Sequence, residues 1–168
     1  FAAPFTYQRP NISCIPILLS EGRSSLITSF QLFRYMAMYS ATQFTAVILC
    51  YFRGSVLGNW EYLYQDLIVV FPLTIFMGST AANRILTSKR PSGDLLSLTN
   101  CLNVLFHLLL NLAFQIFVFQ VSSKQSDYVP YMDAPNFDNT SHTYEATTLY
   151  YFSNFQYITM AFLYALGR

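Results

Sequence analysis

The sequence predicts an all-α membrane protein with four transmembrane helices. Four apolar stretches approach the roughly 20 residues that a helix needs to cross a bilayer. Of the 168 residues, 54% are apolar and 10% are charged, whereas soluble domains carry about 25% charged residues. So few charges cannot cover a water-facing surface of this size, which indicates that much of the surface faces lipid.

The four predicted spans are residues 35–52, 62–78, 98–121 and 147–166. Residues 26–34, which are compatible with a helix, lead into the first span. Runs of this length favour helices because buried strands rarely exceed about eight residues. The second span is short and contains Asp66 and Pro72. We keep it because its omission would place both flanking loops on one side of the membrane, against the charge pattern.

Basic residues gather on one side of this arrangement. They precede the first span, join the second to the third and follow the fourth: Arg9, Arg23 and Arg34; Arg84, Lys89 and Arg90; and Arg168. By the positive-inside rule, both ends of the chain are predicted to be cytosolic. The loop at residues 122–146 is then lumenal, and its sequon Asn139-Thr140-Ser141 predicts a glycan on Asn139.

Composition and motifs exclude several functions. The net charge of +1 and the lack of a basic block argue against nucleic-acid binding. The three cysteines are widely spaced and lack zinc-ligand spacing, so neither a metal site nor a disulfide framework is predicted. No phosphate-binding loop or nucleophile motif is present. The chain alone is therefore not expected to catalyse a reaction.

Asp66 is the only acidic residue within the predicted spans. An ionised carboxylate is costly in hydrocarbon, so such a residue usually faces the bundle interior and has a function. Tyr62 lies one helical turn earlier on the same face, and Pro72, which has no N–H, leaves the Ile68 carbonyl without its donor. A carboxylate, a phenol and a free carbonyl close together favour the binding of a cation, in particular an organic amine that also stacks on aromatic rings. The alternative is that Asp66 pairs with a polar group on a neighbouring helix.

Polar residues of the first span extend this candidate site. Tyr39 and Gln43 are four residues apart on one helical face, and Tyr35 continues the face by one turn. Their neutral side chains can hydrogen-bond an amine without adding charge. The alternative is that they form hydrogen bonds between helices.

The third span carries a polar residue at every fourth position: Asn103, His107, Asn111 and Gln115. Such a stripe faces protein or water instead of lipid. We expect it to hold helices together, and a polar relay in which His107 titrates is the alternative. Asn154 and Gln156 are expected to hold the fourth span to its neighbours.

Short motifs follow one another along the chain in a recognisable order. They are residues 3–6 (APFT), 11–16 (NISCIP), 21–23 (EGR), 33–44 (FRYMAMYSATQF), 57–67 (LGNWEYLYQDL), 90–93 (RPSG) and 153–157 (SNFQY). Together they resemble P5-type ATPases from the exit of the phosphorylation domain into the fifth membrane helix and beyond. The likeness covers nearly the whole chain and is closer to the P5B branch, whose members are polyamine transporters of late endosomes and lysosomes.

The resemblance implies that the four spans are the fifth to eighth helices of a P-type ATPase transport domain. Residues 1–34 would be the cytosolic end of the phosphorylation domain and a helical stalk, and residues 35–167 the transmembrane domain. The chain would be a fragment of a translocase, inactive alone, with ATP and Mg²⁺ bound outside it. Its implied partners are membrane lipid and the remaining helices and cytosolic domains of the same ATPase.

The resemblance also implies a substrate site. Tyr39 and Gln43 match fifth-helix positions that line the polyamine pathway of the family. Asp66 matches the sixth-helix carboxylate that pairs with an amine of the substrate, and Tyr62 stands where relatives carry an aromatic residue. The implied function is ATP-driven export of polyamines from the endosomal or lysosomal lumen to the cytosol.

Two other functions are kept as alternatives. Asn59 stands where close relatives have an acid and Pro72 is not typical of the family, so an inorganic cation is a second substrate class. A non-enzymatic membrane scaffold with four spans is the alternative from another class of protein.

Overall fold

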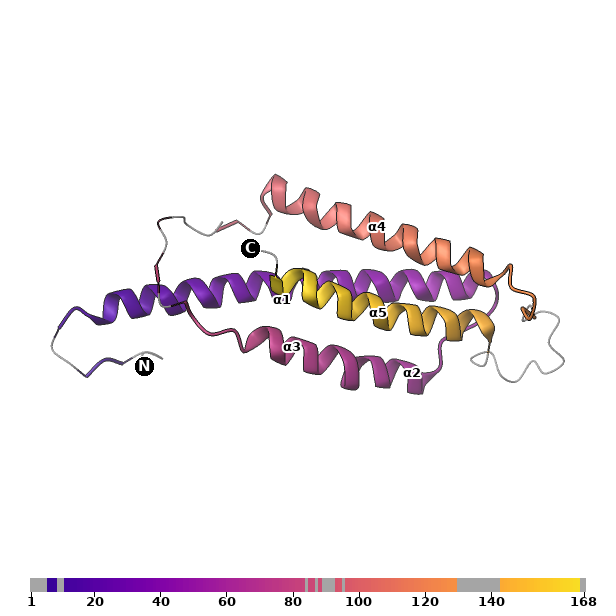
Figure 1. Ribbon diagram of the computed structural model, residues 1–168, viewed down its shortest axis with the longest axis horizontal. Coiled ribbons are helices and arrows are strands. Elements are labelled where there is room, and N and C mark those ends of the chain that lie inside the picture. Colours follow the sequence, from indigo (N-terminus) through magenta and orange to yellow (C-terminus); the bar gives the residue numbers. More distant parts are fainter. Residues whose placement is uncertain are drawn as a thin grey trace.

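The longest element is α1, a single helix of 39 residues, Cys14–Phe52. It is seen in a computed structural model that describes residues 6–8, 11–83, 85, 86, 88, 93, 94, 96–129 and 143–166. Figure 1 shows its C-terminal part within a bundle and its N-terminal part projecting beyond the other helices. At about 1.5 Å per residue the helix is about 58 Å long, roughly twice the thickness of a bilayer core. The predicted stalk and the predicted first span are therefore one continuous helix.

The second predicted span consists of three consecutive helical segments. They are α2 (Asn59–Tyr64), the π-helix η1 (Gln65–Val70) and α3 (Phe71–Gly78). At the end of η1 the Phe71 N–H donates to the Asp66 carbonyl, five residues back. Pro72 follows directly in the first turn of α3. Pro72 is expected to interrupt the regular α-helical hydrogen bonds before it, and the structure shows a π-helix directly on its N-terminal side. Prolines and π-helical turns are both common causes of helix distortion.

The remaining two spans are α4 (Leu98–Ser122) and α5 (Tyr144–Leu166), close to the predicted ranges. Ser97 caps α4 because its side-chain oxygen accepts the Asn100 N–H at 3.4 Å. Residues 130–142, with the predicted glycosylation site Asn139, lie outside the described residues. The same is true of five residues of the predicted topology: Arg9, Arg84, Lys89, Arg90 and Arg168.

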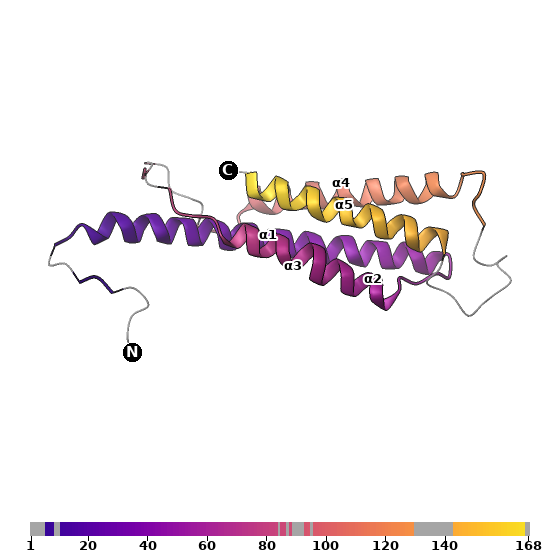
Figure 2. The ribbon, with the colours of Figure 1, turned by 60° about the horizontal axis from the view of Figure 1, so that its bottom comes forward.

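The helices pack side by side around a central pair, α1 and α5. As Figures 1 and 2 show, α4 lies along one side of this pair and the α2–η1–α3 run lies along another. The projecting part of α1 contacts the link after α3. There the Ser20 and Ser24 hydroxyls donate to the carbonyls of Asn83 and Thr80, at 2.9 Å and 3.2 Å.

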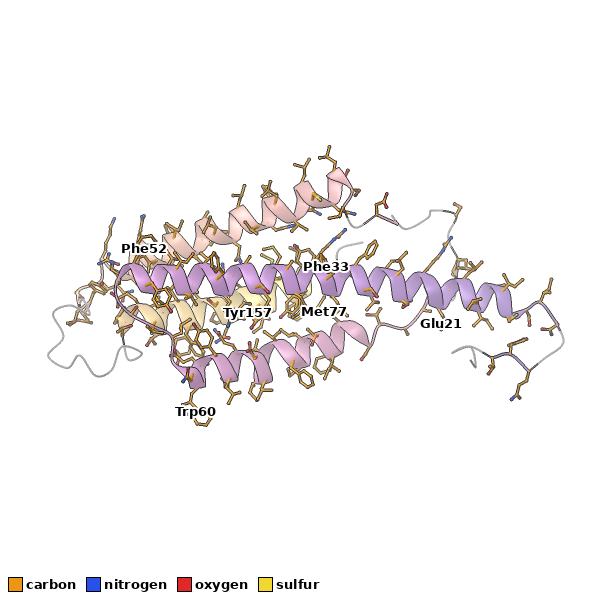
Figure 3. The ribbon with its side chains drawn as sticks, turned by 180° about the vertical axis from the view of Figure 1, so that it is seen from behind. Glu21, Phe33, Phe52, Trp60, Met77 and Tyr157 are labelled. Carbon is orange, nitrogen blue, oxygen red and sulfur yellow. The ribbon has the colours of Figure 1, made fainter. Side chains whose placement is uncertain are left out.

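Two apolar clusters form the interior. The first contains Tyr35, Met38, Val70, Met77, Tyr157, Ala161 and Tyr164. The second contains Ala46, Cys50, Leu57, Phe119, Ala146 and Leu149. Figure 3 shows Tyr157 and Met77 inside the bundle. Many large apolar side chains point outward, among them Phe44, Phe106, Phe117 and Phe162, each at least 61% exposed. An exterior of this kind fits a surface covered by lipid or by further helices.

The prediction of a helical fold is confirmed, since every regular element assigned to the described residues is a helix. By length and apolar composition, one helix among these residues, α4, is long and apolar enough to cross a membrane. The helices α1 and α5 carry the tyrosine, glutamine and asparagine residues of the interior contacts, which lower their apolar content. Four membrane spans therefore remain a prediction.

Candidate functional site

A hydrogen bond between α1 and η1 defines the candidate site. The Tyr39 hydroxyl donates to Asp66 Oδ1 at 2.5 Å, across a sequence separation of 27 residues. Tyr39 is half-buried and Asp66 is exposed on the surface of this chain. The neutral phenol satisfies one carboxylate oxygen and leaves the negative charge in place, so Asp66 can accept further donors from a cation.

A second aromatic ring lies beside this hydrogen bond. The ring of Tyr157, from α5, lies 5.2 Å from the ring of Tyr39 at an interplanar angle of 55°. Tyr157 is only 1% exposed, so its position is fixed by the surrounding helices. The Gln43 side chain lies beside the Tyr39 hydroxyl from the next turn of α1. A carboxylate, a phenol, an amide and a second aromatic ring thus meet between three helices.

The π-helix directs two consecutive polar residues toward different helices. Gln65 is 1% exposed, and its amide lies 3.5 Å from the Tyr150 carbonyl of α5. Asp66, the next residue, reaches α1. A π-helix changes the angular spacing of side chains and often occurs at functional sites. Gln65 therefore fastens the segment to α5 while the carboxylate of Asp66 stays accessible.

Tyr62 lies between this group and the second apolar cluster, because Tyr157 is among its neighbours too. It packs against the second apolar cluster, and Cys50 and Glu61 are among its neighbours. The structure thus brings Tyr39, Gln43 and Asp66 together and places Tyr62 toward the other cluster. A role for any of these residues in substrate binding stays a prediction.

A layer of buried polar residues joins α1, α4 and α5. Thr42 is at its centre: its hydroxyl accepts a hydrogen bond from the Asn111 amide, and its carbonyl accepts one from Gln115 Nε2 at 3.1 Å. Gln115 Nε2 also donates to Gln156 Oε1 at 3.0 Å, and Gln156 Nε2 donates to the Asn111 carbonyl at 3.2 Å. The expectation that Asn111, Gln115 and Gln156 hold helices together is therefore confirmed.

The other two polar residues on this face of α4, Asn103 and His107, lie outside the hydrogen-bonded layer. Asn103 is exposed, and His107 is half-buried with its ring 5.8 Å from the ring of Tyr164. A hydrogen-bonded layer and an aromatic contact therefore follow each other along one helix face.

Sequence reasoning missed both Thr42, as the centre of the polar layer, and Tyr157, as a neighbour of Tyr39. Thr42 follows Tyr39 by three residues, so the i, i+3 spacing was a signal that it lies near the same face. Tyr157 had no comparable signal, because its contact with Tyr39 depends on how α5 packs on α1.

Comparison with curated proteins shows what the chain is similar to. It is 37% identical over 167 residues to the vacuolar cation-transporting ATPase YPK9 of Saccharomyces cerevisiae, a match that covers 99% of this chain and 11% of that protein. It is 35% identical over 188 residues to the polyamine-transporting ATPase 13A3 of Homo sapiens, covering 99% of this chain and 15% of that protein. The chain belongs to the P5-type cation-transporting ATPases.

The likeness extends to other members of this family. The probable cation-transporting ATPase 13A4 of Mus musculus is 41% identical over 128 residues, which are 76% of this chain and 11% of that protein. The chain spans between a tenth and a sixth of the length of these relatives. No model of a protein family matches it.

P5-type ATPases hydrolyse ATP, yet the residues that the structure describes do not fit a site for ATP and Mg²⁺. Within the described part of the chain, no group of three or more His, Cys, Asp or Glu side chains is placed to hold a metal ion. The sequence also lacks a phosphate-binding loop. Within the predicted spans the segment has one carboxylate, Asp66, which is exposed and has tyrosine side chains nearby.

Proposed function

We propose that this chain forms part of the membrane path of an ATP-driven transporter whose substrates are polyamines. The observation that carries the proposal is the Tyr39–Asp66 hydrogen bond beside the ring of Tyr157. An ammonium group is attracted both by a carboxylate and by the face of an aromatic ring. The homology to a polyamine-transporting ATPase supports this choice of substrate class.

An inorganic cation is the second candidate, because YPK9 and the 13A4 protein are named as cation-transporting ATPases. A compact metal ion such as Ca²⁺ takes six to eight oxygen ligands. The described residues around Asp66 offer one carboxylate together with phenol and amide groups. This donor set favours an organic amine over a metal ion.

The proposal includes the coupling of transport to ATP. ATP and Mg²⁺ would bind in a part of the protein outside this chain, and phosphorylation there would move α1. Because α1 is one helix from Cys14 to Phe52, a shift at its projecting end would reach Tyr39. Homology to ATPases favours this function over a non-enzymatic scaffold.

The direction and the membrane are also part of the proposal. Both chain ends would be cytosolic, residues 1–34 would form the stalk region, and residues 122–146 would be lumenal. Polyamines would then leave the lumen of late endosomes or lysosomes for the cytosol. The positive-inside distribution of Arg23 and Arg34 against the outer loops supports this orientation.

The substrate class is tested by transport into proteoliposomes that contain the full-length ATPase. ATP-dependent movement of radiolabelled spermine is compared with that of K⁺, Mg²⁺, Ca²⁺ and Mn²⁺ under the same conditions. The proposal expects spermine to be transported and to stimulate ATP hydrolysis. Transport of a metal ion without any transport of spermine would favour the second candidate.

A further inference from the structure

Glu145, in the first turn of α5, is a buried carboxylate with one unpartnered oxygen. Its side chain is 0% exposed. Oε1 accepts a hydrogen bond from the Tyr128 hydroxyl, whereas Oε2 has no hydrogen-bond partner. Among the residues that the structure describes, the other buried side-chain atoms without a partner belong to phenol, amide, imidazole and guanidinium groups, so Glu145 Oε2 is the one on a carboxylate. A buried negative charge costs far more than a buried neutral group unless it is paired, so this oxygen calls for a positively charged donor.

The carboxylate lies at the predicted lumenal end of the bundle. Figure 1 shows the end of α1, the end of α4 and the start of α5 together at that end. Exposure increases in steps from Glu145 outward: Tyr128, which follows α4, is half-buried, and Arg53, which follows α1, is exposed. A ligand from the lumen would therefore reach the carboxylate by displacing these two side chains.

Arg53 lies close to Glu145 without pairing with it directly. Its Nη1 donates to the Tyr128 hydroxyl at 3.3 Å, and its Nη2 donates to Ser123 Oγ at 3.4 Å. Its guanidinium carbon lies 5.5 Å from the centre of the Phe119 ring. Burial and the hydrogen bond to Glu145 raise the pKa of the Tyr128 hydroxyl above its usual value, so this phenol stays protonated and neutral. Tyr128 thus connects a positive group to a negative one and leaves the second carboxylate oxygen open.

The surroundings of Glu145 favour an ammonium group over a metal ion. Cys50 is a neighbour of both Glu145 and Glu61, and one Glu61 oxygen already accepts the Gly58 N–H at 2.7 Å. Within the described residues, no group of three or more His, Cys, Asp or Glu side chains is placed to hold a metal ion. Tyr62, a neighbour of Cys50 and Glu61, adds an aromatic ring. An ammonium group can use one carboxylate together with aromatic rings and hydroxyl groups.

Simpler roles do not account for the unpartnered oxygen. An acid in the first turn of a helix is stabilised by the helix dipole, but this effect does not require burial. A proton on Oε2 would turn an acceptor without a donor into a donor without an acceptor. A water molecule would give the oxygen a hydrogen bond and leave the negative charge unpaired. A positively charged donor provides both the hydrogen bond and the opposite charge.

We propose that Glu145 is a second binding site for the substrate, which takes an ammonium group of a polyamine from the lumenal side. This inference rests on the proposed function. The ammonium group donates to Oε2 and neutralises the carboxylate. Arg53 opposes this binding, because its positive charge repels the ligand and competes for the same carboxylate.

The Glu145 site is separate from the site at Asp66. Tyr157, whose ring lies beside Tyr39, follows Glu145 by a rise of about 18 Å along α5. Side chains that neighbour one another connect the two, because Cys50 is near Glu145 and Tyr62 is near both Cys50 and Tyr157. A polyamine carries several ammonium groups on one chain, so it can contact Glu145 first and then extend toward Asp66.

The test measures the binding of radiolabelled spermine to the full-length ATPase that carries Asp66→Asn, in which the proposed transport site lacks its charge. In this parent protein we expect Glu145→Gln to weaken spermine binding by about tenfold or more, because a hydrogen bond between charged groups is lost. We expect Arg53→Gln to strengthen binding by about twofold to fivefold, because a competing charge is removed. Lys124→Gln, which removes an exposed positive charge from the same predicted lumenal side, is the control and should bind as the parent does.

Opposite effects of the two variants distinguish a binding site from structural damage, because a variant that only disturbs packing does not bind spermine more tightly. The Arg53→Gln comparison decides the question even if Glu145→Gln does not fold. The proposal is overturned by unchanged binding in a folded Glu145→Gln protein, by weaker binding in Arg53→Gln, or by a lack of saturable binding in the parent.

Failure of the proposed function is observed separately, in the wild type. If spermine does not stimulate ATP hydrolysis there, spermine is not the transported substrate. Binding that still depends on Glu145 would then support this site as one for an organic amine, whatever cation the ATPase transports.

Discussion

Tyr39 and Asp66 join, by one 2.5 Å hydrogen bond, the helix that projects beyond the bundle to the π-helix of the second predicted span. Asp66 has an exposed side chain, and its hydroxyl partner stands on a continuous helix of 39 residues. A displacement of α1 therefore changes the hydrogen bonding of the only carboxylate in the predicted spans. In the proposed function, this hydrogen bond would link cation binding at Asp66 to release of the cation when α1 moves.

Replacing Tyr39 with Phe removes the donor to Asp66 and keeps the ring against Tyr157. Hydrogen bonds to charged groups contribute about 1.5–3 kcal/mol, so the spermine concentration for half-maximal ATPase stimulation should change by about tenfold or more. Tyr51→Phe, on the same helix but 62% exposed, is the control and should behave as the wild type. An unchanged spermine response in Tyr39→Phe would show that this hydroxyl has no part in the site.

A break in the projecting part of α1 should separate ATP chemistry from transport. Ser29→Pro removes a backbone N–H within α1 and costs roughly 3 kcal/mol in a helix interior. We expect the full-length ATPase to form its phosphoenzyme still and to lose most of its spermine transport. Ser29→Ala removes only the side-chain hydrogen bond to the Ser25 carbonyl and should transport normally. Normal transport by Ser29→Pro would argue against coupling through α1.

The polar layer should contribute to stability. Gln115→Leu takes donors away from Gln156 Oε1 and the Thr42 carbonyl, both in the interior. Buried acceptors left without a partner cost about 1–3 kcal/mol, so the apparent melting temperature of the full-length protein in detergent should fall. Gln120→Leu, at an exposed position of the same helix, should change stability by less than about 0.5 kcal/mol. Equal melting temperatures for the two variants would contradict this account of the layer.

The predicted orientation of the chain in the membrane can be tested by glycosylation. Asn139 should carry a glycan and Asn11, whose sequon lies on the predicted cytosolic side, should not. Gel mobility of Asn139→Gln and Asn11→Gln, before and after treatment with a glycosidase, tells these apart. A glycan on Asn11 and none on Asn139 would invert the orientation.

Much of the fold could be predicted from the sequence, because the length and apolar content of each stretch indicate where the long helices lie. The prediction at 98–121 differs from α4 by one residue at its end, and the prediction at 147–166 begins three residues after α5 does. The π-helix at Gln65–Val70 could not be predicted. The residue types of η1 are equally compatible with α-helical hydrogen bonds, and Pro72 signals a disturbance without giving its form.

The candidate site could be predicted in part. Helical spacing put Tyr39 and Gln43 on one face, and the cost of a charge in hydrocarbon singled out Asp66. Their meeting with one another, and with Tyr157, depends on how three helices pack, which a single sequence does not encode in any local pattern. For the same reason Tyr62, one turn from Asp66 in sequence, is found against the second apolar cluster.

The most direct measurement is spermine-stimulated ATP hydrolysis by the full-length ATPase, compared between wild type and Asp66→Asn. The control is Asp127→Asn, which removes an exposed carboxylate outside the site. Because the amide keeps the shape and loses the charge, we expect stimulation to disappear in Asp66→Asn and to persist in the control, with phosphoenzyme formation intact in both. Full stimulation in Asp66→Asn would contradict the assignment of Asp66 as the residue that binds the cation.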